Sequence, residues 1–187
     1  MADLKNIEQA MGRIIKAIGE DPRREGLRET PRRIAEMYAE LFSGVGQDPS
    51  GELKVGFEAG HHEMVIIKDI PFYSLCEHHF LPFYGVAHIG YVPSGRVVGI
   101  SKVARVLEIL ARRPQLQERL TTQVADTLLN ALKPDGVAVV IQAEHLCMTM
   151  RGIKKPGSNI VTSATRGAFR RRAVTRAEFL SLLQSKL

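Results

Sequence analysis

The stretch VAVVIQAEHLCMTMR, residues 137–151, decides the fold. Its first half is rich in β-branched residues, so the whole stretch is predicted to form one long strand. Side chains alternate between the two faces of a strand, which places all the odd-numbered residues on one face. That face is apolar at first and then presents His145, Cys147 and Arg151. We therefore expect a core strand whose last residues line one side of a reactive site.

The residues on either side of this strand show helical and strand patterns in blocks. Helices are predicted by apolar spacing and stop signals over 4–18, 31–43, 102–113 and 115–132, with a C-terminal helix capped by Thr175 and Glu178. Thr30 and Ser101 are expected to cap two of these helices. Further strands are predicted over 64–70 (interrupted by Pro71), 86–92, 96–100 and 161–169, and residues 45–62 as a connection. Helices paired between strands indicate an α+β fold with an antiparallel sheet.

The composition is that of a globular protein, with 44% apolar and 25% charged residues. No apolar run approaches the ~20 residues of a membrane span, and the N-terminal residues lack the apolar core of a secretory signal. A cytoplasmic protein is expected, in which a disulfide between the only two cysteines is disfavoured. The net charge of +6 favours anionic partners, including nucleic acid and phosphorylated substrates, without choosing among them.

The other cysteine, Cys76, lies in the stretch CEHH, residues 76–79. Cys76 and His79 can present sulfur and nitrogen to one point, and Cys147 can supply a third ligand. Thiolate and imidazole ligands suit zinc, and three protein ligands leave the open position that is typical of a catalytic site. Taken alone, Cys147 beside His145 is better explained as a buried structural cysteine near a hydrogen-bonded histidine. The Cys-x-x-His turn reverses that preference.

His78, adjacent to a predicted ligand, is free to face a reacting group, and its ordinary pKa near 6.5 suits proton transfer. A surface histidine is the plainer interpretation. Ser101, Lys102 and Arg105 stand at a helix start, where backbone amides favour an anion, so a phosphate site is as plausible as a solvated basic face. Glu118 and Arg33 are most simply exposed helix residues.

Five motifs occur in an order and spacing that resemble GTP cyclohydrolase I, the zinc-dependent first enzyme of tetrahydrofolate synthesis. They are EGLRETPRRIAEMY (25–38), CEHHFLPFYG (76–85), GISKVARVLEILARRPQLQERLT (99–121), AEHLCMTMRG (143–152) and NIVTSATRGAF (159–169). Each motif alone is weak, but together they cover nearly the whole chain from Glu25 to Phe169.

The resemblance implies a tunnelling fold, an antiparallel sheet with paired helices on one side. It divides the chain into an N-terminal helical region over 1–45 and a catalytic domain over 46–187 that act as one functional unit. Subunits would form rings of five, and two rings would stack into a homodecamer with active sites at subunit interfaces. Neither nucleic acid nor membrane is then an expected partner.

The implied reaction converts GTP and water to 7,8-dihydroneopterin triphosphate and formate, with Zn2+ as cofactor. Cys76, His79 and Cys147 match the family's zinc ligands, and His78 and His145 its proton-transfer residues. The remaining matches concern the substrate. Glu118 matches the carboxylate that pairs with guanine; Ser101, Lys102, Arg105 and Arg151 match the triphosphate-binding set; and Arg33 matches an arginine from a neighbouring subunit.

The nearest alternatives share the fold. A pterin epimerase is not expected to need all three ligands, and a nitrile reductase uses a lone cysteine without this Cys-x-x-His turn. A zinc-dependent deaminase is disfavoured because its His-x-Glu and Pro-Cys-x-x-Cys signature is absent. A zinc-containing nucleic-acid-binding module remains a distant alternative, since it calls for a closed four-ligand site and stacking aromatics.

Overall fold

The centre of the molecule is a five-stranded sheet in the order β5-β2-β3-β6-β7, seen in a computed structural model that describes residues 2–185. The strands are β2 (Val65–Cys76), β3 (Pro82–Val92), β5 (Pro114–Gln115), β6 (Gly136–His145) and β7 (Asn159–Gly167). All pairs are antiparallel except the short parallel contact of β5 with β2. The predicted α+β class with an antiparallel sheet is confirmed.

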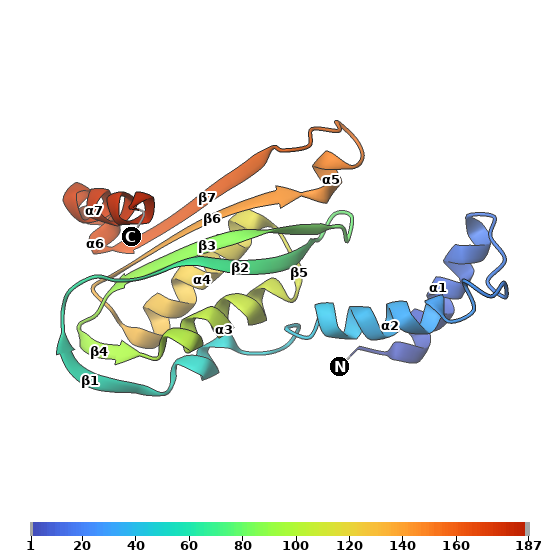
Figure 1. Ribbon diagram of the computed structural model, residues 1–187. Coiled ribbons are helices and arrows are strands. Elements are labelled where there is room, and N and C mark those ends of the chain that lie inside the picture. Colours follow the sequence, from blue (N-terminus) through green and yellow to red (C-terminus); the bar gives the residue numbers. More distant parts are fainter. Residues whose placement is uncertain (1, 186–187) are drawn as a thin grey trace.

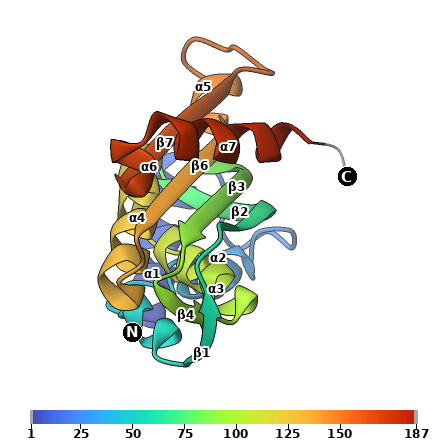
Figure 2. The same cartoon turned by 90° about the vertical axis from the view of Figure 1, so that its left-hand side faces the viewer.

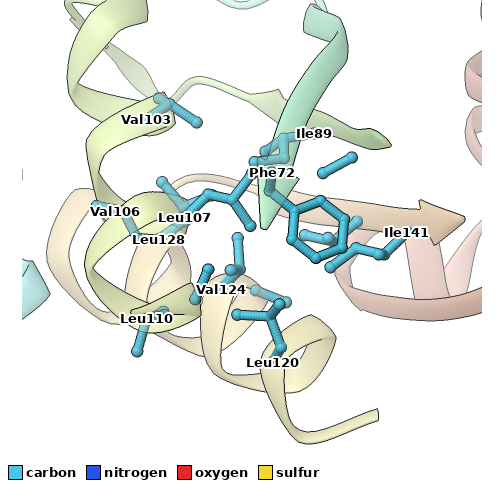
Figure 3. Close-up of a cluster of buried hydrophobic side chains, with 14 of the residues drawn as sticks. Phe72, Ile89, Val103, Val106, Leu107, Leu110, Leu120, Val124, Leu128 and Ile141 are labelled. Atoms are coloured by element: carbon cyan, nitrogen blue, oxygen red, sulfur yellow. The ribbon is translucent and has the colours of Figure 1, made fainter. Parts of the chain in front are cut away.

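Two long helices, α3 (Ile100–Ala111) and α4 (Gln117–Leu132), cover one face of this sheet (Figure 1). Their apolar stripes meet the sheet in the main core, where Leu107, Leu120 and Ile141 are almost fully buried (Figure 3). Helix α7 (Ala173–Gln184) lies on the opposite face, where Phe179 packs on Phe169 and Ala138 (Figure 2). The paired helices on one side are therefore as predicted, and α7 covers part of the other side.

The N-terminal helices α1 (Leu4–Ala17) and α2 (Thr30–Leu41) pack on each other and project beyond one end of the sheet (Figure 1). The remaining elements are short. They are the 3-10 helix η1 (Pro49–Leu53), the paired strands β1 (Gly56–His61) and β4 (Gly95–Val98), and the helical turns α5 (Leu146–Thr149) and α6 (Ala168–Arg171).

The long strand predicted over 137–151 ends at His145, and a helical turn follows it. Within α5 and its end, the Met150 amide donates to the Leu146 carbonyl at 3.1 Å, the hydrogen bond of an α-helix. Both neighbouring strands end here, since Phe83 pairs with His145 and Asn159 pairs with Glu144. Leu and Met, which are not β-branched, then readily form a helical turn. The predicted common face of His145, Cys147 and Arg151 is therefore wrong, although the structure still brings these residues to one end of the sheet.

Other boundaries also differ from the prediction. Strand β2 continues through Pro71. On its other edge β2 pairs with β5 only at Leu75 and Cys76, so this edge is free at Pro71. A proline is tolerated there because no hydrogen bond requires its missing N–H. The three predicted caps are wrong. Helices α2, α3 and α7 begin at or before the expected cap residues, and none has a side-chain hydrogen bond at its cap. The predicted connection over 45–62 contains η1 and β1.

Gly85 makes the closest backbone approach in the central ladder, and its replacement provides a test of the packing. A Cβ at Gly85 would lie 1.9 Å from the Gln142 carbonyl oxygen, whereas a Cβ at Gly12 in α1 meets nothing within 4 Å. We expect Gly85→Ala to destabilise the fold by about 1–3 kcal/mol or more, because neighbouring backbone must move. Gly12→Ala, the matched control, should stabilise it by about 0.5–1 kcal/mol. Urea unfolding measures both, and equal stabilities would contradict the β3–β6 register.

Candidate metal centre and active site

The turn between β2 and β3 holds the CEHH residues in a closed loop. The Cys76 amide donates to the Leu81 carbonyl at 2.9 Å, and the Phe80 amide donates to the Cys76 carbonyl at 2.8 Å. Phe80 has a φ of +52°, an uncommon value for a bulky residue, and its ring packs on Phe42 of the segment after α2 at 5.3 Å between centroids. The Glu77 amide donates to the Gln115 carbonyl at 3.0 Å, which fixes the turn to β5.

Cys76, His79 and Cys147 converge at this turn. One donor atom from each lies within 4.8 Å of the other two. Tetrahedral zinc with bonds of about 2.0–2.3 Å holds its ligand atoms roughly 3.5 Å apart, so small side-chain movements suffice to close the cluster on a metal. Burial and the neighbouring Cys76 thiol raise the pKa of Cys147. A bound cation would remove that penalty, because it stabilises adjacent thiolates. The donor set therefore fits a metal with sulfur and nitrogen preference and leaves one coordination position for a non-protein ligand.

Arg151 lies beside this cluster, directly after the turn α5. Its Nη1 is 3.0 Å from Nε2 of His79. A guanidinium group can only donate hydrogen bonds, so Nε2 of His79 presents its lone pair toward this position. His78 is exposed, and its ring is nearly perpendicular to that of His79, with an interplanar angle of 86°. The two adjacent rings therefore lie edge to face, and a role of His78 toward a reacting group stays a prediction.

His145, at the end of β6, is fixed by Gln117 in the first turn of α4. The Gln117 amide nitrogen donates to the Ile141 carbonyl at 3.0 Å and the Ile160 carbonyl at 2.9 Å. Because carbonyls can only accept, the Gln117 oxygen must face His145, whose Nε2 lies 2.8 Å away and donates to it. The neutral His145 ring then keeps its lone pair on Nδ1.

Two neighbours shape the environment of the His145 ring. It stacks on Phe83, with 4.6 Å between centroids. Burial lowers the pKa of His145, and the negative charge of Glu118 opposes this shift. A neutral ring of fixed orientation is the form of histidine that can accept or relay a proton near neutral pH.

Gln117 is the residue that the sequence analysis missed. It is 1% exposed and lies on the same stripe of α4 as Leu120, Val124 and Leu128. A polar residue at a position where the helical pattern calls for an apolar one is the signal that could have indicated it, because buried amides require partners.

The residues that follow Gln117 in α4 connect this helix to the turn that holds the metal-binding candidates. Glu118 is exposed and points away from the core, close enough to influence His145. Arg119 donates two hydrogen bonds to the two carboxylate oxygens of Glu77 and lowers the pKa of that carboxyl group. This paired contact holds the metal turn, which contains Cys76 and His79, against α4. It therefore fixes the position of Glu118 relative to the Cys-His-Cys cluster.

Four predicted substrate-binding residues lie away from this centre in the same chain. Ser101, Lys102 and Arg105 occupy the start of α3, which runs from β4 toward β5 (Figure 1). The rise of an α-helix places Ser101 about 15 Å before the end of α3, where the chain turns into β5 beside Cys76. Arg33 is exposed in the first turn of α2, on the end that projects from the sheet (Figure 1). Within residues 2–185, the ion pairs of Lys102 and Arg105 go to Glu52, and Arg105 shares a hollow of about 590 Å³ with Ser74, Leu75 and Pro82, which flank the metal turn.

An α+β fold with a Cys-His-Cys cluster beside His145, whose ring is oriented by Gln117, is an arrangement suited to a metal-dependent hydrolase. The family model described as GTP cyclohydrolase I matches residues 7–184. A GTP cyclohydrolase 1 from Dehalococcoides mccartyi is 66% identical over 188 residues, covering 100% of both chains. One from Pelotomaculum thermopropionicum is 59% identical over 187 residues, again covering 100% of both. The chain belongs to the GTP cyclohydrolase I family, and the resemblance seen in its motifs is confirmed.

A solved archaeosine synthase QueF-Like in the apo form is also similar in structure, with a TM-score of 0.45 and 20% identity. The match covers 56% of this chain and 93% of that one. This likeness is too distant to bear on function.

The Gln117 contacts predict the tautomer of His145. Nitrogen NMR of the imidazoles should show the neutral His145 ring protonated at Nε2. Gln117→Leu should abolish this preference and destabilise the fold by about 1–3 kcal/mol, because buried hydrogen-bonding groups lose their partner. Gln123→Leu serves as the control, since within residues 2–185 the Gln123 side chain accepts from Gln115 and makes no hydrogen bond to His145. An Nδ1-protonated ring in the unaltered protein would contradict the assigned orientation.

Proposed function

We propose that Cys76, His79 and Cys147 bind one zinc ion and that this centre opens the imidazole ring of GTP. Members of this family convert GTP and water to 7,8-dihydroneopterin triphosphate and formate, the first step of tetrahydrofolate and pterin synthesis. The observation that carries the proposal is the convergence of three soft donors within 4.8 Å at the end of the sheet. Zinc held there would supply a Lewis acid that makes water nucleophilic near pH 7.

The histidines are proposed to move protons. His78, which is exposed, would protonate the purine nitrogen as the ring opens. His145 would accept or return a proton at Nδ1, since Gln117 occupies its Nε2. A lowered pKa keeps His145 neutral and ready to accept at neutral pH.

Glu118 is proposed to recognise guanine. A carboxylate accepts two hydrogen bonds side by side, and the amide and amino hydrogens of guanine form that pair of donors, which adenine lacks. Glu118 is exposed beside His145, and the Glu77–Arg119 pair holds its helix to the metal turn. Base recognition and ring opening would then occur on adjacent residues.

The triphosphate is proposed to meet Arg151 from the chain that holds the metal and Ser101, Lys102 and Arg105 from a second subunit. Arg33 would come from a further neighbour. The position of Arg33 on the part of α2 that projects from the sheet (Figure 1) supports an active site completed at subunit interfaces. Such sites agree with the proposed homodecamer of two stacked pentamers.

The surface of the chain supports this assembly. Within residues 2–185, the outer edge of β7 and the first part of β2 have no strand partner, and such edges can pair between subunits. An apolar hollow of about 900 Å³ between α1, α2 and Phe80 would also be covered by a neighbour. We further propose residues 1–45 as the helical region and 46–187 as the catalytic domain of one functional unit.

A cytoplasmic location is proposed on two observations. No helix within residues 2–185 has the length and apolar character needed to cross a membrane. Cys76 and Cys147 are free thiols, which suits a reducing compartment. GTP is the proposed partner besides further copies of the chain, and neither nucleic acid nor membrane is proposed.

Metal analysis tests the proposed centre. The purified protein should contain one zinc ion per chain by elemental analysis, and Cys147→Ser should lose most of it, because the serine hydroxyl is a much weaker ligand than a thiolate. Removal of zinc by a chelator should abolish formate release, and added zinc should restore it. Cys147→Ser that retains full zinc would contradict the assigned ligand set.

GTP turnover tests the proposed reaction. Incubation with GTP should release formate and give the fluorescence of an oxidised pterin, and ATP should give neither. Glu118→Gln should reduce kcat/KM by about 100-fold or more. The glutamine amide would direct an N–H donor at one of the two guanine hydrogens, and the remaining hydrogen bond would no longer be strengthened by a negative charge. Glu58→Gln, which removes an equal charge on β1, is the control. Formate without pterin would indicate an enzyme that stops after ring opening, and unimpaired Glu118→Gln would refute the guanine assignment.

A further inference from the structure

One carboxylate, that of Glu52, contacts two of the cations at the start of α3. Its Oε2 is 3.0 Å from Nζ of Lys102 and 3.7 Å from Nη1 of Arg105. Within residues 2–185, every salt bridge of these two cations goes to Glu52. Glu108, the nearest acid along α3, is instead paired with Arg112 at 2.8 Å.

The fold holds Glu52 at this position through the 3-10 helix η1. Leu53, the next residue, is 3% exposed and belongs to the main core. The Asp48 carboxylate accepts from the Ser50 amide at 2.9 Å and fixes the first residues of η1. Glu52 and Lys102 have side chains that are 26% and 31% exposed, so water screens their contact less than it screens an open surface pair. The position of the carboxylate is therefore part of the packing of η1 on α3.

The start of α3 is a place where an anion is favoured, since helix amides and two cations face the same region. A carboxylate oxygen and a phosphate oxygen accept hydrogen bonds from the same donors. A triphosphate that approaches Lys102 and Arg105 must therefore displace Glu52 or bind close to its charge. Lys102 also lowers the pKa of Glu52, so the carboxylate is charged at neutral pH.

We propose that Glu52 is an internal counter-ion for Lys102 and Arg105, a positioning residue that lowers the affinity of this end of the site for the triphosphate group. It holds both cations in place before substrate arrives and opposes tight retention of the triphosphate product. The inference rests on the proposed function, in which Lys102 and Arg105 bind the triphosphate.

Binding of inorganic tripolyphosphate to the purified, zinc-loaded full chain tests this role by calorimetry, together with kcat and KM for GTP. Glu52→Gln keeps the shape and removes the charge, and Glu52→Ala removes the hydrogen bond as well. Both should bind tripolyphosphate about three- to tenfold more tightly, because a negative charge near the anion is lost, and KM for GTP should fall with an equal or lower kcat. Guanosine, which carries no phosphate, should bind all variants equally.

Asp126→Asn is the matched control, since Asp126 also pairs with an arginine of another element, at 2.7 Å from Arg166. It should leave tripolyphosphate affinity unchanged, and thermal unfolding of each variant separates a loss of folding from a change in affinity. Unchanged or weaker tripolyphosphate binding by both Glu52 variants would overturn the inference. Lys102→Ala distinguishes that result from failure of the proposed function. If Lys102→Ala binds tripolyphosphate as tightly as the unaltered protein, the assignment of Lys102 to triphosphate binding is itself wrong.

Discussion

The antiparallel ladder between β3 and β6 is the constraint on which both the core and the site depend. It pairs Phe83 with His145 at one end and Val92 with Gly136 at the other. Because side chains alternate along a strand, a slip of one residue would turn every core residue of β6 to the opposite face. The same slip would separate the CEHH turn, which precedes β3, from the α5 turn, which follows β6. Seventy residues lie between Cys76 and Cys147, and this register brings their sulfur atoms together.

Around that ladder, polar contacts convert a packed sheet end into a site with fixed geometry. Gln117 satisfies two backbone carbonyls and the His145 ring with a single buried amide, so the orientation of a reactive group is tied to the pairing of β6 with β7. Arg119 and Glu77 tie α4 to the metal turn in the same way. A site built from such contacts requires little rearrangement when substrate binds, which favours catalysis through preorganisation.

The charges follow a different arrangement. The cations at the start of α3 and on α2 come from other elements than the metal donors, and Glu52 is paired with Lys102 and Arg105. A highly charged substrate bound between subunits would be held by groups that no single subunit assembles. In the proposed assembly, substrate binding would therefore depend on contacts between subunits.

The sequence by itself determined the α+β class, the helix pair, the three metal-binding candidates and the family, because these depend on local periodicity and on residue types at short spacing. Only the tertiary structure decided that β6 stops at His145, that β2 passes through Pro71, and that Gln117 is the partner of His145. These features depend on which strand edges are paired and which polar groups are buried. Such contacts join residues far apart in the chain, and spacing along the sequence carries no direct record of them.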